Sequence, residues 1–179
     1  RTLSFDTITT PLTRFSIIIP ARNEQDNIAN CIKSIAQQSY PTDLYEIIVI
    51  DDFSEDNTAL IIQGLQQQYA NLKLLQLKDY YLPNELNAFK KKAIEKAVSL
   101  SHGDWIVTTD ADCIVPKYWL RHYDQYIQLH QPVFVAAPVM FIKTTGFLNQ
   151  FQLLDFMALQ GITAAAVGAG KHSMSNGAN

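Results

Sequence analysis

The stretch W-I-V-T-T-D-A-D-C, residues 105–113, runs from an apolar, β-branched segment into two carboxylates separated by one alanine. Apolar residues at nearly every position are typical of a strand that is buried on both faces. Asp110 and Asp112 would then stand where this strand reaches the surface. In an extended segment, the side chains of residues i and i+2 point to the same side. We therefore expect the two acids to share a face, with the small Ala111 leaving room for a ligand.

Similar apolar runs recur along the chain and alternate with segments of helical periodicity. Strands are expected at 15–20, 46–51, 72–77, 105–110 and, as V-F-V-A-A-P-V, at 133–139. Helices are expected at 28–35, from Ser54 or Asp56 to Tyr69, at 86–101 with Gly103 as a left-handed C-terminal cap, after Pro116, and at 146–167. Buried strands separated by helices predict an α/β fold, with a Rossmann-like, mostly parallel sheet flanked by helices.

Composition narrows the class of protein. The chain has 179 residues, of which 47% are hydrophobic and 17% charged, with a formal net charge of −3. This composition is typical of a globular protein, and we expect a single domain over 1–179. The only basic cluster is K-K-K at 90–92, so the sequence lacks the footprint of a nucleic-acid-binding protein. Two cysteines, Cys31 and Cys113, make no disulfide framework, and no uninterrupted apolar run is long enough to span a bilayer.

Three polar clusters follow expected strands: P-A-R-N-E at 20–24, D-D-F-S-E-D at 51–56 and D-A-D at 110–112. In an open parallel sheet, ligands bind beyond the carboxyl ends of the strands, so these clusters should converge on one crevice. Acids this concentrated repel one another unless a positive charge lies among them. Mg²⁺ or Mn²⁺, which take carboxylate, phosphate and water oxygens, would supply it. Alone, D-x-D is also explained by aspartates that cap a turn before Pro116, but the two matching clusters favour the functional interpretation.

Five segments together carry a family resemblance that covers nearly the whole chain from Phe15 onward. They are S-I-I-I-P-A-R-N-E (16–24), I-I-V-I-D-D-F-S-E-D-N-T (47–58), K-K-A-I-E-K-A (91–97), G-D-W-I-V-T-T-D-A-D-C (103–113) and N-G-A-N (176–179). With them the chain resembles the amino-terminal part of a family 2 glycosyltransferase of the GT-A fold. The resemblance implies a metal-dependent, inverting transfer of a sugar from a nucleotide-sugar donor, expected to be a UDP-sugar, to a hydroxyl of a carbohydrate or lipid-linked acceptor.

The resemblance also implies roles for single residues. Pro20, Ala21, Arg22 and Glu24 would line the nucleotide site, with Arg22 on a phosphate or facing solvent, and Asp52 would accept a hydrogen bond from uracil. Asp110 would lie near the ribose and the metal, beside Ala111, and Asp112 would be the metal ligand proper. Lys91 or Lys92 would reach the donor phosphates, unless the lysine run is only a solvated helix face. Asn176, Gly177, Ala178 and Asn179 would lie near the donor sugar or the acceptor.

The resemblance implies that the catalytic base lies beyond Asn179. We therefore expect a domain that is incomplete on its C-terminal side, keeps much of the donor site and lacks the base. Asp155, the only acid in the late helix, is the candidate base within the chain, although capping, pairing or lining the acceptor side explains it better. The parent protein is expected on the cytoplasmic side, anchored in the inner membrane, in the synthesis of bacterial cell-envelope polysaccharide.

Three alternatives stay open from the residues alone. A nucleotidyltransferase would need a glycine-rich phosphate loop early in the chain, and P-A-R-N-E contains no glycine. A phosphoacceptor module would explain V-I-D-D but would leave D-A-D without a role. A non-catalytic nucleotide-binding or assembly fragment is the third alternative. The apolar late helix, with Phe147, Phe151 and Leu154, is expected to pack on further structure or on a membrane surface.

Overall fold

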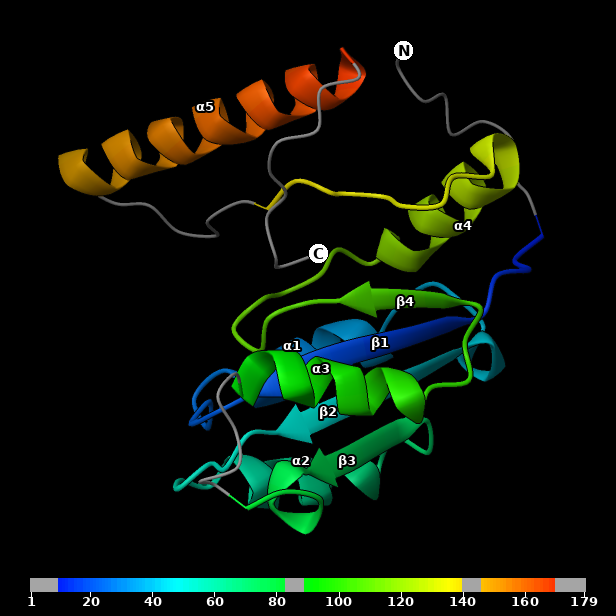
Figure 1. The fold of residues 1–179 in the computed structure, drawn as a ribbon, viewed down its shortest axis with the longest axis vertical. Coiled ribbons are helices and arrows are strands. Elements are labelled where there is room, and N and C mark those ends of the chain that lie inside the picture. The colour runs from blue at the N-terminus through cyan, green and yellow to red at the C-terminus, as the bar shows by residue number, and fades with distance from the viewer. Residues whose placement is uncertain (1–9, 83–88, 140–145, 170–179) are drawn as a thin grey trace. The chain divides into compact units, whose positions relative to one another are not determined.

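The computed structural model describes residues 10–82, 89–139 and 146–169, and the chain divides into two compact units between Pro132 and Val133. The first unit contains a four-stranded sheet (Figure 1), in which every neighbouring pair of strands is parallel. The strands are β1 (Phe15–Ala21), β2 (Tyr45–Asp51), β3 (Leu72–Gln76) and β4 (Trp105–Thr108), in the order β3-β2-β1-β4. The predicted α/β fold with a parallel sheet is confirmed.

Helices lie against both faces of the sheet. They are α1 (Ile28–Ala36), α2 (Thr58–Gln66), α3 (Phe89–Ser99) and α4 (Trp119–His130), with short 3₁₀ turns η1 (Thr42–Leu44) and η2 (Leu77–Asp79). Side chains of α1, α2 and α4 share one core with Ile17 and Ile19 of β1. Side chains of α3 and η2 share a second core with Ile18. Figure 1 shows α3 in front of the sheet, with α1 and α2 behind it. The alternation of side chains along β1 therefore feeds two apolar layers, which explains why its sequence is continuously apolar.

A polar network around the partly buried Glu46 joins the strands at the end of the sheet opposite their carboxyl ends. Glu46 of β2 accepts hydrogen bonds from Ser16 Oγ of β1 (2.6 Å), the His102 N–H (2.6 Å) and Lys73 Nζ of β3 (2.7 Å). Burial raises the pKa of the Glu46 carboxyl, but the hydrogen bonds from Lys73, Ser16 and His102 outweigh burial and bring the pKa to about 2. The ionised carboxylate thus stabilises the pairing of three strands and the approach to β4.

Gly103 does not have the predicted role of a left-handed helix cap. α3 ends at Ser99, and Gly103 does not adopt a positive φ. A Cβ atom at this position would lie 2.5 Å from the backbone N of Ser16 and 2.6 Å from the carbonyl carbon of Phe15. The Gly103 N–H also donates to Ser16 Oγ (2.8 Å). Glycine is required here because the chain entering β4 passes directly against the backbone of β1.

The second unit contains α5 (Phe147–Gly168) and the segment from Val133 to Val139, which is not the predicted strand. No strand pairs with this segment among the described residues. The backbone of Val139 instead forms hydrogen bonds with the side chain of Gln160 on α5, at 2.9 Å and 2.6 Å. Apolar composition alone cannot distinguish a paired strand from such an extended segment. Within the described ranges, no helix is both long and apolar enough to cross a membrane.

Replacing Gly103 by alanine is expected to destabilise the first unit by about 2–4 kcal/mol, because the new methyl group would collide with backbone atoms that cannot move independently. Gly64→Ala, at an exposed position of α2, is the matched control, since nothing lies within 4 Å of the Cβ position there. The control should raise the free energy of unfolding by about 0.5–1 kcal/mol. Urea denaturation of both variants checks this, and equal effects would contradict the close approach at Gly103.

Candidate functional site

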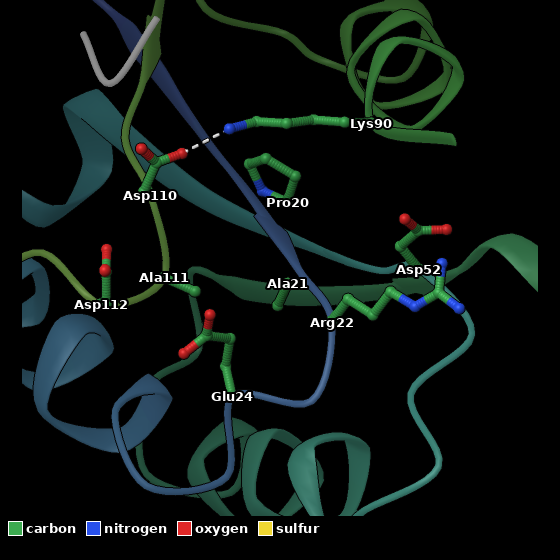
Figure 2. A pocket seen from close by; sticks show the side chains of 9 residues that line it. All are labelled: Pro20, Ala21, Arg22, Glu24, Asp52, Lys90, Asp110, Ala111 and Asp112. Atoms are coloured by element: carbon green, nitrogen blue, oxygen red, sulfur yellow. Dashed lines mark hydrogen bonds and ion pairs between the residues drawn. The ribbon is translucent and has the colours of Figure 1, made fainter. Parts of the chain in front are cut away.

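A pocket of about 260 Å³ lies at the carboxyl ends of β1, β2 and β4 (Figure 2). Its lining brings together the polar ends of three separate strands and one residue of α3. The lining residues are Pro20, Ala21, Arg22, Glu24, Asp52, Lys90, Asp110, Ala111 and Asp112. Eight of these nine were named from the sequence, so the structure places the three polar clusters at one crevice. This is where ligands bind in open parallel sheets.

The loops after β1 and β2 are held together by side-chain to backbone hydrogen bonds. The Asn23 N–H donates to Ser54 Oγ (3.0 Å), and Asn23 Oδ1 accepts from the Glu55 N–H (2.8 Å). Asn23 and Phe53 each adopt a left-handed conformation, with φ of 55° and 52°. Asparagine tolerates this conformation because its short amide can bond to nearby backbone. The two loops therefore form one cross-linked rim rather than two independent loops.

Further hydrogen bonds extend this rim to the start of α2. The Glu24 N–H donates to Thr58 Oγ1 (2.8 Å), and the Gln25 N–H donates to Asp56 Oδ2 (3.1 Å). Asp56 Oδ1 in turn accepts from the Thr58 N–H (2.9 Å), but the N-cap of α2 is Asn57, so neither Ser54 nor Asp56 occupies the predicted cap position. Glu24 thus lines the pocket from a backbone that α2 fixes.

Asp52 lines the pocket with an acceptor that lacks a partner. Only 6% of the residue is exposed, and within the described part of the chain Asp52 Oδ1 is buried without a hydrogen-bond partner, as is Oδ1 of Asp51. Burial is the main cause that raises the pKa of Asp52; Arg22, whose guanidinium lies close by in Figure 2, acts in the opposite direction, and Asp51 adds to the rise. A buried acceptor of this kind is satisfied when a ligand brings a donor.

The D-A-D segment is a turn and not the predicted extension of a strand. β4 ends at Thr108, and the Cys113 N–H donates to the carbonyl of Asp110 (3.2 Å), with Ala111 and Asp112 in the turn between them. The carbonyl of Asp110 closes this turn, so its carboxylate is left for other contacts. Two acids spaced by one residue still line the same pocket, but through turn geometry rather than strand alternation.

The side of α1 nearest this turn anchors the chain that follows β4. Cys31 and Ser34 lie on α1, Gln38 lies just beyond its C-terminal end, and each forms a hydrogen bond with that chain. The bonds join Cys31 Sγ to the Asp110 carbonyl (3.6 Å), the Val115 N–H to Ser34 Oγ (3.1 Å) and Gln38 Nε2 to the Pro116 carbonyl (2.7 Å). Sequence reasoning missed Ser34 and Gln38, because their role depends on contacts with a segment about 80 residues further along the chain.

The two cysteines lie beside the D-A-D turn as free thiols. Burial raises the pKa of Cys31 to about 12, and burial likewise raises the pKa of Cys113, which is only partly buried. Both sulfurs therefore stay protonated at neutral pH. Neither cysteine lines the pocket, whose acidic side chains offer oxygen atoms as ligands.

The lysine that lines the pocket is Lys90, and not Lys91 or Lys92 as predicted. Lys90 Nζ lies 2.7 Å from Asp110 Oδ1. Lys91 and Lys92 instead pair with Glu95 on their own helix, at 3.9 Å and 2.8 Å. Successive residues of a helix point about 100° apart, so only one of three adjacent lysines can face a given pocket.

The pocket offers a divalent cation only part of a complete shell of ligands. Among the described residues, no group of three or more histidine, cysteine or acidic side chains is arranged to hold a metal ion. Asp110 and Asp112 nevertheless offer carboxylate oxygens at one pocket wall. Mg²⁺ is commonly bound by one or two carboxylates, with phosphate and water oxygens completing its shell. The chain therefore matches a site that a bound diphosphate completes.

The remaining predicted residues lie elsewhere. Asp155 is exposed on α5, in the second unit. Asn176, Gly177, Ala178 and Asn179 lie outside the described residues. The base role of Asp155 and the acceptor-side role of the N-G-A-N segment stay predictions.

Comparison with known proteins identifies the family. The sequence profile described as Glycosyl transferase family 2 matches residues 16–163. The chain belongs to this family. β-Monoglucosyldiacylglycerol synthase of Synechocystis is 30% identical over 76% of the chain and 27% of that protein. Poly(ribitol-phosphate) β-N-acetylglucosaminyltransferase TarS of Staphylococcus aureus is 28% identical over 74% of the chain and 21% of that protein. Family 2 membership argues against the nucleotidyltransferase and phosphoacceptor alternatives.

Solved structures show the same fold. A crystal structure of S. aureus TarS has a TM-score of 0.56 at 25% identity and covers 73% of this chain and 24% of TarS. The mannosyltransferase PcManGT of Pyrobaculum calidifontis, in complex with GDP-Man and Mn²⁺, has a TM-score of 0.59 at 24% identity, covering 78% of this chain and 39% of PcManGT. A TarS fragment was also solved with UDP-GlcNAc. The predicted GT-A fold is confirmed. The chain spans about a quarter of the length of the two curated relatives named above.

Asp52→Asn is expected to make the fold more stable at pH 7, by about 1 kcal/mol, because the folded protein disfavours the ionised carboxylate. The folded-state pKa is raised, so the cost of ionisation appears as the pH rises above the ordinary value of an aspartate. Near about pH 3, where aspartate is protonated in both states, the gain should vanish. Urea denaturation at both pH values measures it.

The matched control is Asp56→Asn, in the same loop. At Asp56, hydrogen bonds from Thr58 and the Gln25 N–H outweigh desolvation and lower the pKa, so this carboxylate stabilises the fold when ionised. The control is therefore expected to lower stability at pH 7. A loss of stability in both variants would show that Asp52 is not strained by burial.

Proposed function

We propose that the chain carries the donor site of a metal-dependent, inverting glycosyltransferase that uses a UDP-sugar. The observation that supports this most directly is the pocket itself, where Asp52, a lysine and the D-A-D acids meet at the carboxyl ends of three strands, and where Oδ1 of Asp52 is buried without a hydrogen-bond partner among the described residues. These groups suit three features of a nucleotide-sugar with a bound cation: a base that carries a hydrogen-bond donor, the diphosphate, and the cation on that diphosphate. Family 2 membership, over residues 16–163, supports the same activity.

Asp52 is proposed to recognise the base. Its buried Oδ1 can accept from the N3–H of uracil, which would satisfy an acceptor that has no hydrogen-bond partner in the described part of the chain. Cytosine has no hydrogen at N3 and would leave the carboxylate facing a ring nitrogen lone pair. The placement of Asp52 between Arg22 and the end of β2 in Figure 2 leaves its carboxylate at the pocket wall.

The D-A-D turn and Lys90 are proposed to face the diphosphate. Asp112 and Asp110 would hold Mg²⁺ or Mn²⁺ with phosphate oxygens, and Lys90 would offer an ammonium group as a point charge. A cation bound there stabilises the negative charge that develops on the leaving diphosphate. The complex of PcManGT with GDP-Man and Mn²⁺ supports cation use in this fold.

The stereochemistry and the acceptor are inferred from relatives. TarS is named a β-N-acetylglucosaminyltransferase, and UDP-GlcNAc carries its sugar in α linkage, so a β product requires inversion. We propose the same single displacement here, with an acceptor hydroxyl deprotonated by a general base that the pocket itself does not provide. The names of the relatives favour a lipid or polymer acceptor at the cell envelope.

The match to the family profile covers residues 16–163 and so crosses the boundary between the two units at Pro132. This match supports the proposal that both units belong to one domain.

Asp112→Ala is expected to remove the effect of Mn²⁺ on UDP binding, weakening binding in the presence of Mn²⁺ by at least about 10-fold. The physical reason is the loss of a carboxylate oxygen from a cation that has few protein ligands. Isothermal titration of UDP with and without Mn²⁺ measures it. Asp104→Ala, an exposed acid before β4 and outside the pocket, is the control and should bind as the parent does. An Mn²⁺ effect that survives in Asp112→Ala would rule out the metal-ligand assignment.

Selectivity for the base tests the role of Asp52. The parent should prefer UDP to CDP by about 1–3 kcal/mol, which is roughly 5- to 150-fold in Kd. In Asp52→Asn the amide can rotate to donate to N3 of cytosine, so the preference should shrink or reverse. Titrations of both nucleotides with saturating Mn²⁺ measure the ratio. An unchanged ratio in the variant would show that another group reads the base.

A further inference from the structure

We propose that Lys90 is an internal counter-cation: it holds Asp110 while no divalent cation is bound, and it must leave Asp110 before a cation can use that carboxylate. The inference rests on the proposed function, because it concerns the order in which the same pocket is filled. In this proposal one lysine couples the binding of the metal to the binding of the nucleotide. Its ammonium group leaves the carboxylate of Asp110 and pairs with a phosphate of the nucleotide instead.

The geometry of the ion pair carries the proposal. Lys90 comes from α3 and Asp110 from the turn after β4, and the 2.7 Å contact between Nζ and Oδ1 is drawn in Figure 2 between two walls of the pocket. The oxygen that Lys90 contacts belongs to one of the two D-A-D carboxylates. A cation that binds this carboxylate would therefore lie close to the ammonium group and would be repelled by it.

The pair is poorly explained as a stabilising surface contact. The side chains of Lys90 and Asp110 are 58% and 35% exposed, and ion pairs this exposed add little to folding. Lys91 and Lys92 show the ordinary arrangement, in which a helix lysine pairs with an acid of its own helix, here Glu95. Lys90 instead reaches across to another element, into a pocket that four acids line.

The charges around the pocket explain why a lysine is needed there and why it must move. Glu24, Asp110 and Asp112 lie on the side of the pocket away from Arg22, which lies beside Asp52 (Figure 2). Lys90 is thus the cation that offsets the D-A-D acids among the residues that line the pocket. A divalent cation at D-A-D would repel the ammonium group. A diphosphate offers that group a new partner, so each ligand favours the binding of the other.

Lys90→Met separates the two contributions, because methionine keeps an apolar stem without the charge. Without nucleotide, Mn²⁺ should bind the variant about 3- to 10-fold more tightly than the parent, since its competitor is gone. With saturating Mn²⁺, UDP should bind about 10-fold more weakly, since a phosphate contact is gone. Electron paramagnetic resonance of free Mn²⁺ measures the first affinity, and calorimetry measures the second.

Two further variants serve as controls. Lys92→Met removes an equally charged lysine of α3 that pairs with Glu95, and it should leave both affinities unchanged. Lys90→Arg keeps the charge and should keep Mn²⁺ affinity near that of the parent. Circular dichroism melting of every variant checks that the fold is intact.

The outcomes separate this inference from the proposed function. If Mn²⁺ binds Lys90→Met no more tightly than the parent, while the parent binds UDP with Mn²⁺, Lys90 is not a competitor and the inference alone fails. If the parent binds neither UDP nor Mn²⁺, the proposed function fails and the inference falls with it. Opposite shifts of the two affinities in Lys90→Met, absent in Lys92→Met, support the exchange, because a purely structural ion pair would not move them in opposite directions.

Discussion

The pairing of β1 with a parallel strand on each side is the constraint on which the rest of the structure depends. Its register sets Ala21 opposite Asp51 and Ile18 opposite Thr108. The chain therefore leaves all three strands at the same edge, within a few residues of the same level, and the polar segments that follow have to meet. A slip of one residue would turn Ile18 from one apolar layer to the other and would separate the clusters, so the apolar core that fixes the register also assembles the pocket.

The pocket that this register assembles contains polar groups that the protein alone does not satisfy. The pocket gathers four acids and two basic residues. Among the described residues, Oδ1 of Asp52 is buried without a hydrogen-bond partner, and no group of three or more side chains is arranged to hold a metal ion. Such groups are unfavourable in a folded protein unless something completes them. A nucleotide diphosphate with its cation supplies donors, charge and oxygen ligands together, which is why the unsatisfied groups support the proposed function better than any one of them would.

The sequence predicted this arrangement where local pattern decides structure, and failed where contacts between distant segments decide it. Apolar runs located all four strands of the sheet, and the polar residues behind three of them located the pocket. The choice among Lys90, Lys91 and Lys92 depends on the rotational phase of α3, and the need for glycine at position 103 depends on the backbone of β1, which no local pattern reveals. The segment 133–139 has the composition of a strand, but among the described residues no strand pairs with it. The strand predicted there from composition was therefore wrong.

The contacts between α1 and the chain after β4 position the site, and the sequence did not predict them. α1 begins at Ile28, shortly after the P-A-R-N-E loop. Cys31 and Ser34 of α1, together with Gln38 just beyond its end, hold the chain after β4. One helix therefore fixes both the loop proposed to face the nucleotide and the turn proposed to face the cation. A site held by rigid elements keeps its geometry when one ligand is absent. Movement on ligand binding can then be confined to side chains such as Lys90, while the carboxylates stay in place.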